Sequence, residues 1–185
     1  MRTSLSENYV ALDPVNTIPY GVIKHPYIAV TTEQVNVYKE PNSESQIFNT
    51  VYGGATISFL GIVDGYAKIN YKRKYAYIDA TKLKNLVMVS PTDEPLSDET
   101  PIAAFTSFYD HHTGKTGNEG RCLNIVHSCK FMSRVLQPGE QLDFNKQVGP
   151  YTKARGYHLA PVLIDGAAKP GYGGGTCQSS STLYN

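Results

Sequence analysis

The stretch 56–71, TISFLGIVDGYAKINY, has two runs rich in β-branched and aromatic residues on either side of Asp64-Gly65. Asp-Gly between such runs is the strongest short-range signal for a β-hairpin, because a tight type I′ turn needs positive φ at both central residues. In the first run Ile57 and Phe59 alternate with polar neighbours, so we expect both to point into a core. The stretch therefore predicts paired antiparallel strands.

The sequence on both sides of this hairpin predicts further short strands. Val35 and Val37 alternate with polar residues, and KYAYIDATKL, residues 74–83, is another alternating run. Several short strands at close spacing are typical of a small barrel. We therefore predict a β domain over residues 30–89.

Four short motifs lie in residues 30–83. Their members are Asn36, Val37, Tyr38 and Pro41; Gly54, Ile57 and Phe59; Asp64, Gly65 and Tyr66; and Ala76, Tyr77 and Ile78. With these motifs the region resembles bacterial SH3-like (SH3b) domains, although tyrosine, tyrosine and alanine replace the usual Arg, Trp and Gly at 38, 66 and 76. The resemblance implies a small SH3-like barrel that binds peptidoglycan peptides, with Tyr38, Tyr66 and Tyr77 as candidate groove residues. A spacer or docking module without a ligand of its own is the alternative.

The composition changes on both sides of this domain. SPTDEPLSDETP, residues 90–101, combines three prolines with acidic and hydroxyl residues and predicts an interdomain linker. Residues 1–29 contain prolines at 14, 19 and 26 and predict an extended N-terminal arm. Residues 102–185 then form the second domain.

The second domain has one helical pattern among strand-like runs. IAAFTSFYD (102–110) and residues 160–164 predict strands, and EGRCLNIVHSCKFMSRVL (119–136) predicts an amphipathic helix. The expected apolar face of that helix contains Cys122, Ile125, Val126, Cys129 and Met132. Two cysteines seven residues apart on a helix are about 10 Å apart, too far for a disulfide, so we expect both thiols to be buried and reduced. The predicted fold class is mainly β plus α+β.

The chain ends in GYGGGTCQSSSTLYN, residues 171–185, which brings a glycine run to Cys177. A phosphate loop would need a lysine that is missing here, and a dinucleotide fingerprint would need glycine in place of Thr176. A helix that begins near Cys177 would favour its thiolate, and the glycines would let a substrate carbonyl approach backbone N–H groups. The competing interpretation is a tight structural turn with a small buried cysteine.

Many residues of the second domain match a family pattern in order. They are Arg121, Asn124 and Ile125; Pro138, Gly139, Glu140, Leu142, Asp143, Phe144 and Asn145; Val148, Gly149, Gly156, Tyr157 and Ala160; and Gly173, Gly174, Gly175, Cys177, Gln178, Ser180, Thr182, Leu183, Tyr184 and Asn185. With them residues 105–185 resemble the VanW family, which is named from vancomycin-resistance clusters and has no defined activity. Members usually continue past this point, so the resemblance implies an incomplete domain. Candidate site residues are Cys177, as a catalytic nucleophile, and Gly173, Gly174, Gly175 and Gln178.

Several histidines of the second domain could act as a base or bind a metal ion. Asp110, His111 and His112 form a polar cluster, but adjacent histidines on an extended chain point in opposite directions. We expect no cofactor, with zinc held by one of them and His158 or a distant carboxylate as an alternative. His127 and Cys129 resemble the His–Cys pair of L,D-transpeptidases, but they lie in mid-helix with the cysteine on the apolar face.

Composition excludes several classes of partner. The 185 residues carry 17 basic and 16 acidic side chains, a net charge of +1, which gives no general attraction to nucleic acid. The sequence contains no run of about 18 apolar residues, the length needed to span a membrane, and the start of the chain lacks the apolar core of a leader.

The two resemblances together predict a protein of the bacterial cell envelope, extracellular or associated with the cell wall, whose leader is not present in this chain. Its predicted function is peptidoglycan binding through the SH3b module, next to a VanW-like domain of undefined activity. The alternatives are a peptidoglycan amidase, peptidase or transpeptidase, dependent on cysteine or zinc, and a structural domain pair whose partner is another envelope protein.

Overall fold

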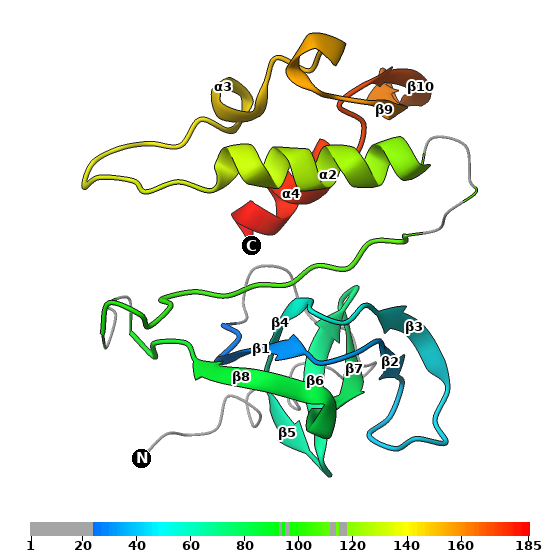
Figure 1. The fold of residues 1–185 in the computed structure, drawn as a ribbon, viewed down its shortest axis with the longest axis vertical. Coiled ribbons are helices and arrows are strands. Elements are labelled where there is room, and N and C mark those ends of the chain that lie inside the picture. Colours follow the sequence, from blue (N-terminus) through cyan, green and yellow to red (C-terminus); the bar gives the residue numbers. More distant parts are fainter. Residues whose placement is uncertain (1–23, 93, 95–96, 112–113, 115–117) are drawn as a thin grey trace. The chain divides into compact units, whose positions relative to one another are not determined.

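A computed structural model of the chain describes residues 24–92, 94, 97–111, 114 and 118–185. The chain divides into two compact units, of which the first contains the described residues 24–108 and the second is Tyr109–Tyr184. The first unit is built from strands, and the second combines helices with a hairpin (Figure 1). The predicted fold class, mainly β plus α+β, is confirmed. Residues 1–23 of the predicted arm lie outside the described residues.

Eight strands and one short 3₁₀ helix make up the described part of the first unit. They are β1 (Tyr27–Thr31), β2 (Val35–Tyr38), β3 (Ile47–Val51), β4 (Thr56–Phe59), β5 (Gly61–Val63), β6 (Tyr66–Tyr71), β7 (Lys74–Asp79), η1 (Ala80–Lys82) and β8 (Leu83–Met88). The strands form two antiparallel sheets, ordered β4-β1-β8 and β3-β2-β7-β6-β5. Both sheets contribute side chains to one core.

The hairpin predicted at Asp64-Gly65 joins β5 to β6. Val63 pairs with Tyr66, and φ is 49° at Asp64 and 82° at Gly65. Positive φ at both central residues is what a type I′ turn requires, and an aspartate tolerates this conformation better than most residues. The prediction from the Asp-Gly pair is confirmed.

Alternation also predicts the core correctly. Val35, Val37, Ile57 and Phe59 are each at most 2% exposed. The core cluster consists of Ala29, Val35, Val37, Ile57, Phe59, Ala67, Ile69, Tyr71, Ala76 and Ile78. Because these residues recur every second position along β2, β4, β6 and β7, the opposite face of the five-stranded sheet is left for polar and aromatic side chains.

The segment 102–110 is not a strand, so that prediction is wrong. Part of it is held to the first unit by side chains instead of by a backbone ladder. The Thr106 hydroxyl accepts the N–H of Ser58 at 2.8 Å and the Ser58 hydroxyl at 3.0 Å, and the Phe105 ring lies 5.3 Å from the ring of His25. Residues 102–108 thus belong to the first unit.

One backbone hydrogen bond joins the two ends of the predicted linker, 90–101. The N–H of Ser90 donates to the carbonyl of Pro101 at 2.8 Å, and the preceding N–H, of Val89, donates to Pro26. The segment therefore leaves and returns to the first unit at one place. The domain limits drawn from the sequence stay predictions.

Three helices, one 3₁₀ helix and a two-stranded hairpin make up the described part of the second unit. They are α2 (Asn118–Met132), α3 (Phe144–Val148), η2 (Lys153–Arg155), β9 (Leu159–Ile164), β10 (Ala167–Tyr172) and α4 (Thr176–Tyr184). The predicted strand at 160–164 is confirmed by β9, and the predicted helix start near Cys177 by α4. The helix predicted over 119–136 ends at Met132. No helix in the described part of the chain has the length and apolar character needed to cross a membrane.

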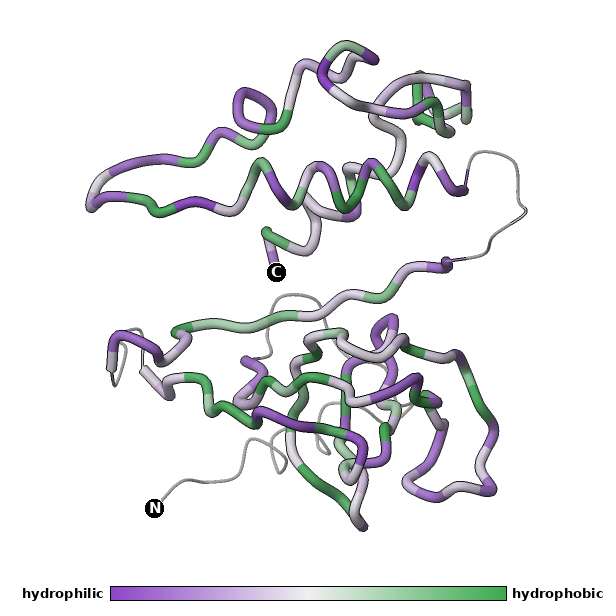
Figure 2. The backbone as a smooth tube through the Cα atoms, in the orientation of Figure 1, coloured by the Kyte–Doolittle hydropathy of each residue, from purple (hydrophilic) through white to green (hydrophobic). Residues whose placement is uncertain are grey.

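The buried face of α2 differs from the predicted one. Cys122, Asn124, Ile125 and Ser128 are buried, whereas Cys129 is exposed and Val126 is 50% exposed. Hydrophobic and hydrophilic residues follow one another around every turn of α2 (Figure 2), so hydropathy alone marks no clean face. Burial of Cys122 is confirmed, and burial of Cys129 is wrong. Both cysteines are free thiols.

Candidate functional site

Three predicted groove tyrosines lie together on one face of the five-stranded sheet. Tyr38 of β2 is the register partner of Tyr77 of β7, and the rings of Tyr38 and Tyr66 meet edge-on with centroids 5.9 Å apart. All three are partly exposed, on the side of the sheet opposite the core. We call this surface, Tyr38, Tyr66 and Tyr77, the tyrosine face. Asn36 supports it by donating from its amide to the Tyr38 hydroxyl at 3.2 Å.

The glycine run of the second unit packs against backbone and rings. A Cβ on Gly174 would lie 2.4 Å from the carbonyl oxygen of Pro161, and one on Gly175 would lie 2.9 Å from the carbonyl oxygen of Arg121. A Cβ on Gly173 would lie 2.7 Å from the Tyr151 ring, and φ is 83° at Gly173 and 103° at Gly175. Side chains are excluded from all three positions, because real Cβ atoms do not approach this closely and positive φ strains them. The glycines thus serve close packing.

Asn124 of α2 ties this run to His158, the residue before β9. Its side-chain amide donates to the carbonyls of His158 at 3.0 Å and Gly174 at 2.9 Å, and its Oδ1 accepts the N–H of His158 at 2.8 Å. Asn124 is fully buried. A buried asparagine with three bonds to the backbone satisfies groups that the turn leaves unpaired. Asn124 therefore holds three segments of the unit together.

Cys177 is the second residue of α4, and its side chain is exposed. The interpretation of Cys177 as a small buried residue is therefore wrong. The N–H of Thr176 donates to the carbonyl of Gly173 at 3.2 Å, and the N–H of Gln178 donates to Gly175 at 2.9 Å. These two donors are used inside the turn, so an oxyanion would have to rely on other N–H groups.

Tyr151 lies against the glycine run. Burial raises the pKa of Tyr151, a side-chain hydrogen bond with Thr176 lowers it, and the charge of Cys177 raises it further. The Tyr151 hydroxyl donates to Oδ1 of Asn145 at 3.1 Å, and its ring stands against Gly173. Sequence reasoning missed Tyr151, because no motif marks it and only the fold brings it to the glycine run.

Part of the second unit is similar to known proteins. Residues 120–185 match the family described as VanW like protein. By this similarity we refer to residues 120–185 as the VanW-like domain. It includes Asn124, the glycine run and Cys177, so the residues that hold the turn together are those of the family region.

One relative is the "Uncharacterized protein YoaR" of Bacillus subtilis (strain 168). It is 42% identical to this chain over 71 residues, which are 38% of this chain and 23% of the relative. The matched part therefore spans about a quarter of the relative's length.

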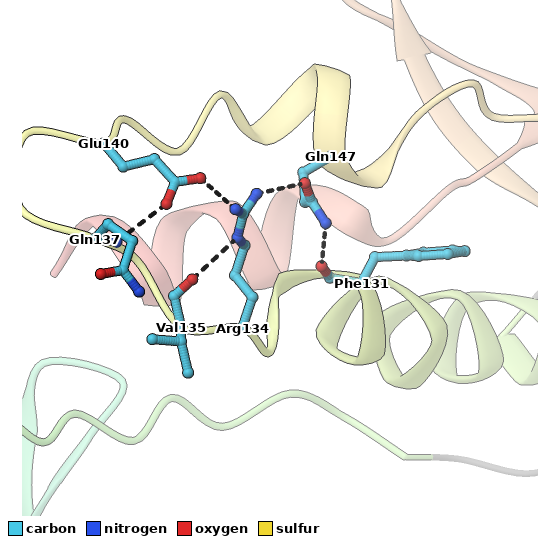
Figure 3. A network of polar contacts seen from close by, with 6 residues as sticks. All are labelled: Phe131, Arg134, Val135, Gln137, Glu140 and Gln147. Atoms are coloured by element: carbon cyan, nitrogen blue, oxygen red, sulfur yellow. Dashed lines mark hydrogen bonds and ion pairs between the residues drawn. The ribbon is translucent and has the colours of Figure 1, made fainter.

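A second motif of the VanW-like domain, Pro138-Gly139-Glu140, is built around a surface network (Figure 3). The Glu140 carboxylate accepts the N–H of Gln137 at 3.0 Å and the Arg134 guanidinium, which also donates to the side-chain oxygen of Gln147 at 3.2 Å. The amide of Gln147 donates to the carbonyl of Phe131, in the last turn of α2, at 2.9 Å. The network fixes the loop between α2 and α3, which is a structural role.

His25 and His127 have hydrogen-bond partners other than Cys177. In the described residues no hydrogen bond joins the Cys177 thiol to a histidine. Nε2 of His127 lies 2.7 Å from the carbonyl oxygen of Arg155, and the Cys129 thiol faces the Ser179 hydroxyl at 3.7 Å, so His127 and Cys129 have different partners.

No described group of three or more His, Cys, Asp or Glu side chains could hold a metal ion. Asp110, His111 and His158 are described, whereas His112 lies outside the described residues. The described part of the chain therefore offers no set of ligands for the alternative of a zinc site.

Proposed function

We propose that the chain is a protein of the bacterial cell envelope, extracellular or wall-associated, that binds peptidoglycan through an SH3b-like β unit and carries a VanW-like domain. The observation that supports this proposal is the tyrosine face. Three aromatic side chains from three strands lie next to one another on the side of the sheet that the core leaves free.

Tyrosines suit a peptide ligand. Each ring offers a large apolar surface with few rotatable bonds, and each hydroxyl can donate or accept a hydrogen bond. Rings that are only partly exposed are also held in place by their neighbours, so little side-chain entropy is lost on binding. Peptidoglycan stem peptides combine methyl groups with amide and carboxyl groups, and a rigid surface of this kind can bind both.

We expect the full chain to sediment with purified peptidoglycan, and Tyr66→Ala to weaken this binding by roughly tenfold, as for a central aromatic contact. Tyr66 is the suitable position because its ring meets Tyr38 and its backbone continues the type I′ hairpin. Tyr184→Ala, which changes a 91% exposed tyrosine of the other unit, is the matched control and should bind like the wild type. Equal sedimentation of both variants, or no sedimentation of the wild type, would contradict the proposal.

A second candidate function is a cysteine-dependent enzyme acting on peptidoglycan. It is favoured by one observation, the exposed thiol in the first turn of α4. There the positive end of the helix dipole stabilises an anion.

If this second function is right, Cys177→Ser should abolish release of soluble fragments from peptidoglycan, because a serine hydroxyl is a far weaker nucleophile without a base. The free energy of unfolding should change by less than about 0.5 kcal/mol, since the side chain is exposed. Cys129→Ser is the control, as it changes another exposed thiol of the same unit. Absence of fragment release by the wild type rules out the enzyme and leaves the binding proposal untouched.

A further inference from the structure

Two carboxylates lie beside the tyrosine face. Glu40 follows Tyr38 by two residues, and Asp64 precedes Tyr66 by two residues in the β5–β6 turn. Burial is the main cause of the raised pKa of Tyr77, and the charges of Glu40 and Asp64 raise it further. Because the rings of Tyr38 and Tyr66 meet, and each carboxylate stands two residues from one of these tyrosines, the two carboxylates flank this ring contact from two different loops.

Neither carboxylate has an ion pair or side-chain hydrogen bond within the described part of the chain. Asp79, the register partner of Tyr66, differs in this respect. Its carboxylate accepts the N–H and the hydroxyl of Thr81 and so caps η1. No described cation therefore pairs with the carboxylate of Glu40 or of Asp64.

Two cations near the tyrosine face are held by partners of their own. Lys82 forms an ion pair with Glu33 at 2.7 Å. Lys68, the register partner of Tyr77, places its ammonium 3.7 Å from the centroid of the Tyr75 ring. This side of the sheet therefore already holds one ammonium against a tyrosine, as the negative face of an aromatic ring favours.

We propose that the tyrosine face recognises an ammonium group of its ligand, which Glu40 and Asp64 hold against the rings. The inference rests on the proposed peptidoglycan binding and names the ligand class, stem peptides with a free side-chain amine. Charge-assisted hydrogen bonds and cation–π contacts both disappear when the amine is acylated. The uncharged peptide retains only the stacking and amide contacts.

The test compares the tripeptide L-Ala-γ-D-Glu-L-Lys with its Nε-acetyl derivative by calorimetric titration of the full chain. We expect acetylation to weaken binding by about tenfold or more. The double variant Glu40→Gln/Asp64→Asn should bind the free amine as weakly as the wild type binds the acetylated peptide. Asparagine adopts the positive φ required at position 64, so the hairpin is preserved. Glu44→Gln, in the same β2–β3 loop as Glu40, is the matched control and should change nothing.

The outcomes separate the two proposals. Equal affinity for the two peptides overturns the recognition of the amine and leaves peptidoglycan binding standing. If acetylation weakens binding to the wild type, but the double variant still binds the free amine more tightly than the wild type binds the acetylated peptide, the assignment to Glu40 and Asp64 is wrong. If neither peptide binds while intact peptidoglycan sediments with the chain, the ligand class is wrong, and if intact peptidoglycan fails as well, both proposals fall.

Discussion

Replacement of Asn124 by alanine is expected to lower the stability of the VanW-like domain by about 3 kcal/mol or more. The side chain is fully buried and makes three hydrogen bonds, to the N–H and carbonyl of His158 and to the carbonyl of Gly174. Each buried polar group that loses its partner costs about 1–3 kcal/mol. The glycine run cannot shift to compensate, because Gly174 already approaches Pro161 closely.

Asn124→Asp distinguishes hydrogen bonding from packing. Aspartate has nearly the same shape and can still accept the N–H of His158, but its second oxygen would face two carbonyl oxygens. We expect it to be destabilising as well, whereas a role in packing alone would leave it close to the wild type. The control is Lys130→Ala, at an exposed position of the same helix.

The buried thiol of Cys122 provides the measurement. Its modification rate, followed by mass spectrometry of the peptide that contains it, reports how often α2 opens, without contributions from the first unit. An opening free energy that is unchanged in Asn124→Ala would show that the three bonds contribute nothing to the stability of this unit.

The residues of the hairpin and core were predictable because local chemistry determines them. Asp64-Gly65 fixes a turn type, and strict alternation around Val35 and Ile57 fixes which face is buried. The helix start before Cys177 was predictable for a similar reason, since the glycine run, with positive φ at Gly173 and Gly175, ends the preceding strand. Each of these signals acts within a few residues.

The buried face of α2 was not predictable from hydropathy. Hydropathy counts Asn124 and Ser128 as polar and Val126 as apolar, yet the first two are buried and Val126 is half exposed. Asn124 and Ser128 are buried because their partners, His158 just before β9 and Ser179 of α4, come from 34 and 51 residues away along the chain. A hydrogen bond to a distant segment leaves no periodic trace in a sequence.

The segment 102–110 shows the same limit for strands. Its composition suits a strand, but Thr106 bonds to Ser58 through its side chain, and Phe105 packs on His25. Among the candidate site residues, the three tyrosines could be placed on one face from alternation. Tyr151 could not be assigned to the glycine run, because only the tertiary fold brings it there.

We expect the first unit to lose about 3 kcal/mol of stability as the pH falls from about 6.5 to about 4, through one histidine. His25 is 1% exposed, and burial lowers its pKa from 6.5 to about 4. The Ser58 hydroxyl donates to Thr106, so Nδ1 of His25 donates to Ser58, at 2.6 Å, and Nε2 carries no proton. Among the described groups Nε2 has no hydrogen-bond partner, so a proton added there would be buried without an acceptor.

The direction of the pH effect follows from the lowered pKa. Between pH 6.5 and 4 the unfolded chain binds a proton at this histidine and the folded chain does not, so stability falls as the pH falls. Below about pH 4 both states are protonated and the loss is complete. Each pKa unit corresponds to about 1.4 kcal/mol, which gives the loss of about 3 kcal/mol.

Urea denaturation at several pH values, followed by tyrosine fluorescence and far-ultraviolet circular dichroism, measures this loss. In His25→Gln the contribution of His25 to the pH dependence between 6.5 and 4 should disappear, whatever the variant's stability at pH 7, because glutamine does not titrate. His158→Gln, which changes an exposed histidine of the other unit, should retain the wild-type dependence. Carboxylates that titrate in the same range contribute equally to the wild type and to His25→Gln. Their contribution therefore cancels in the difference between the two free energies of unfolding. If that difference stays constant from pH 7 to pH 4, His25 is not the group that makes the first unit sensitive to acid.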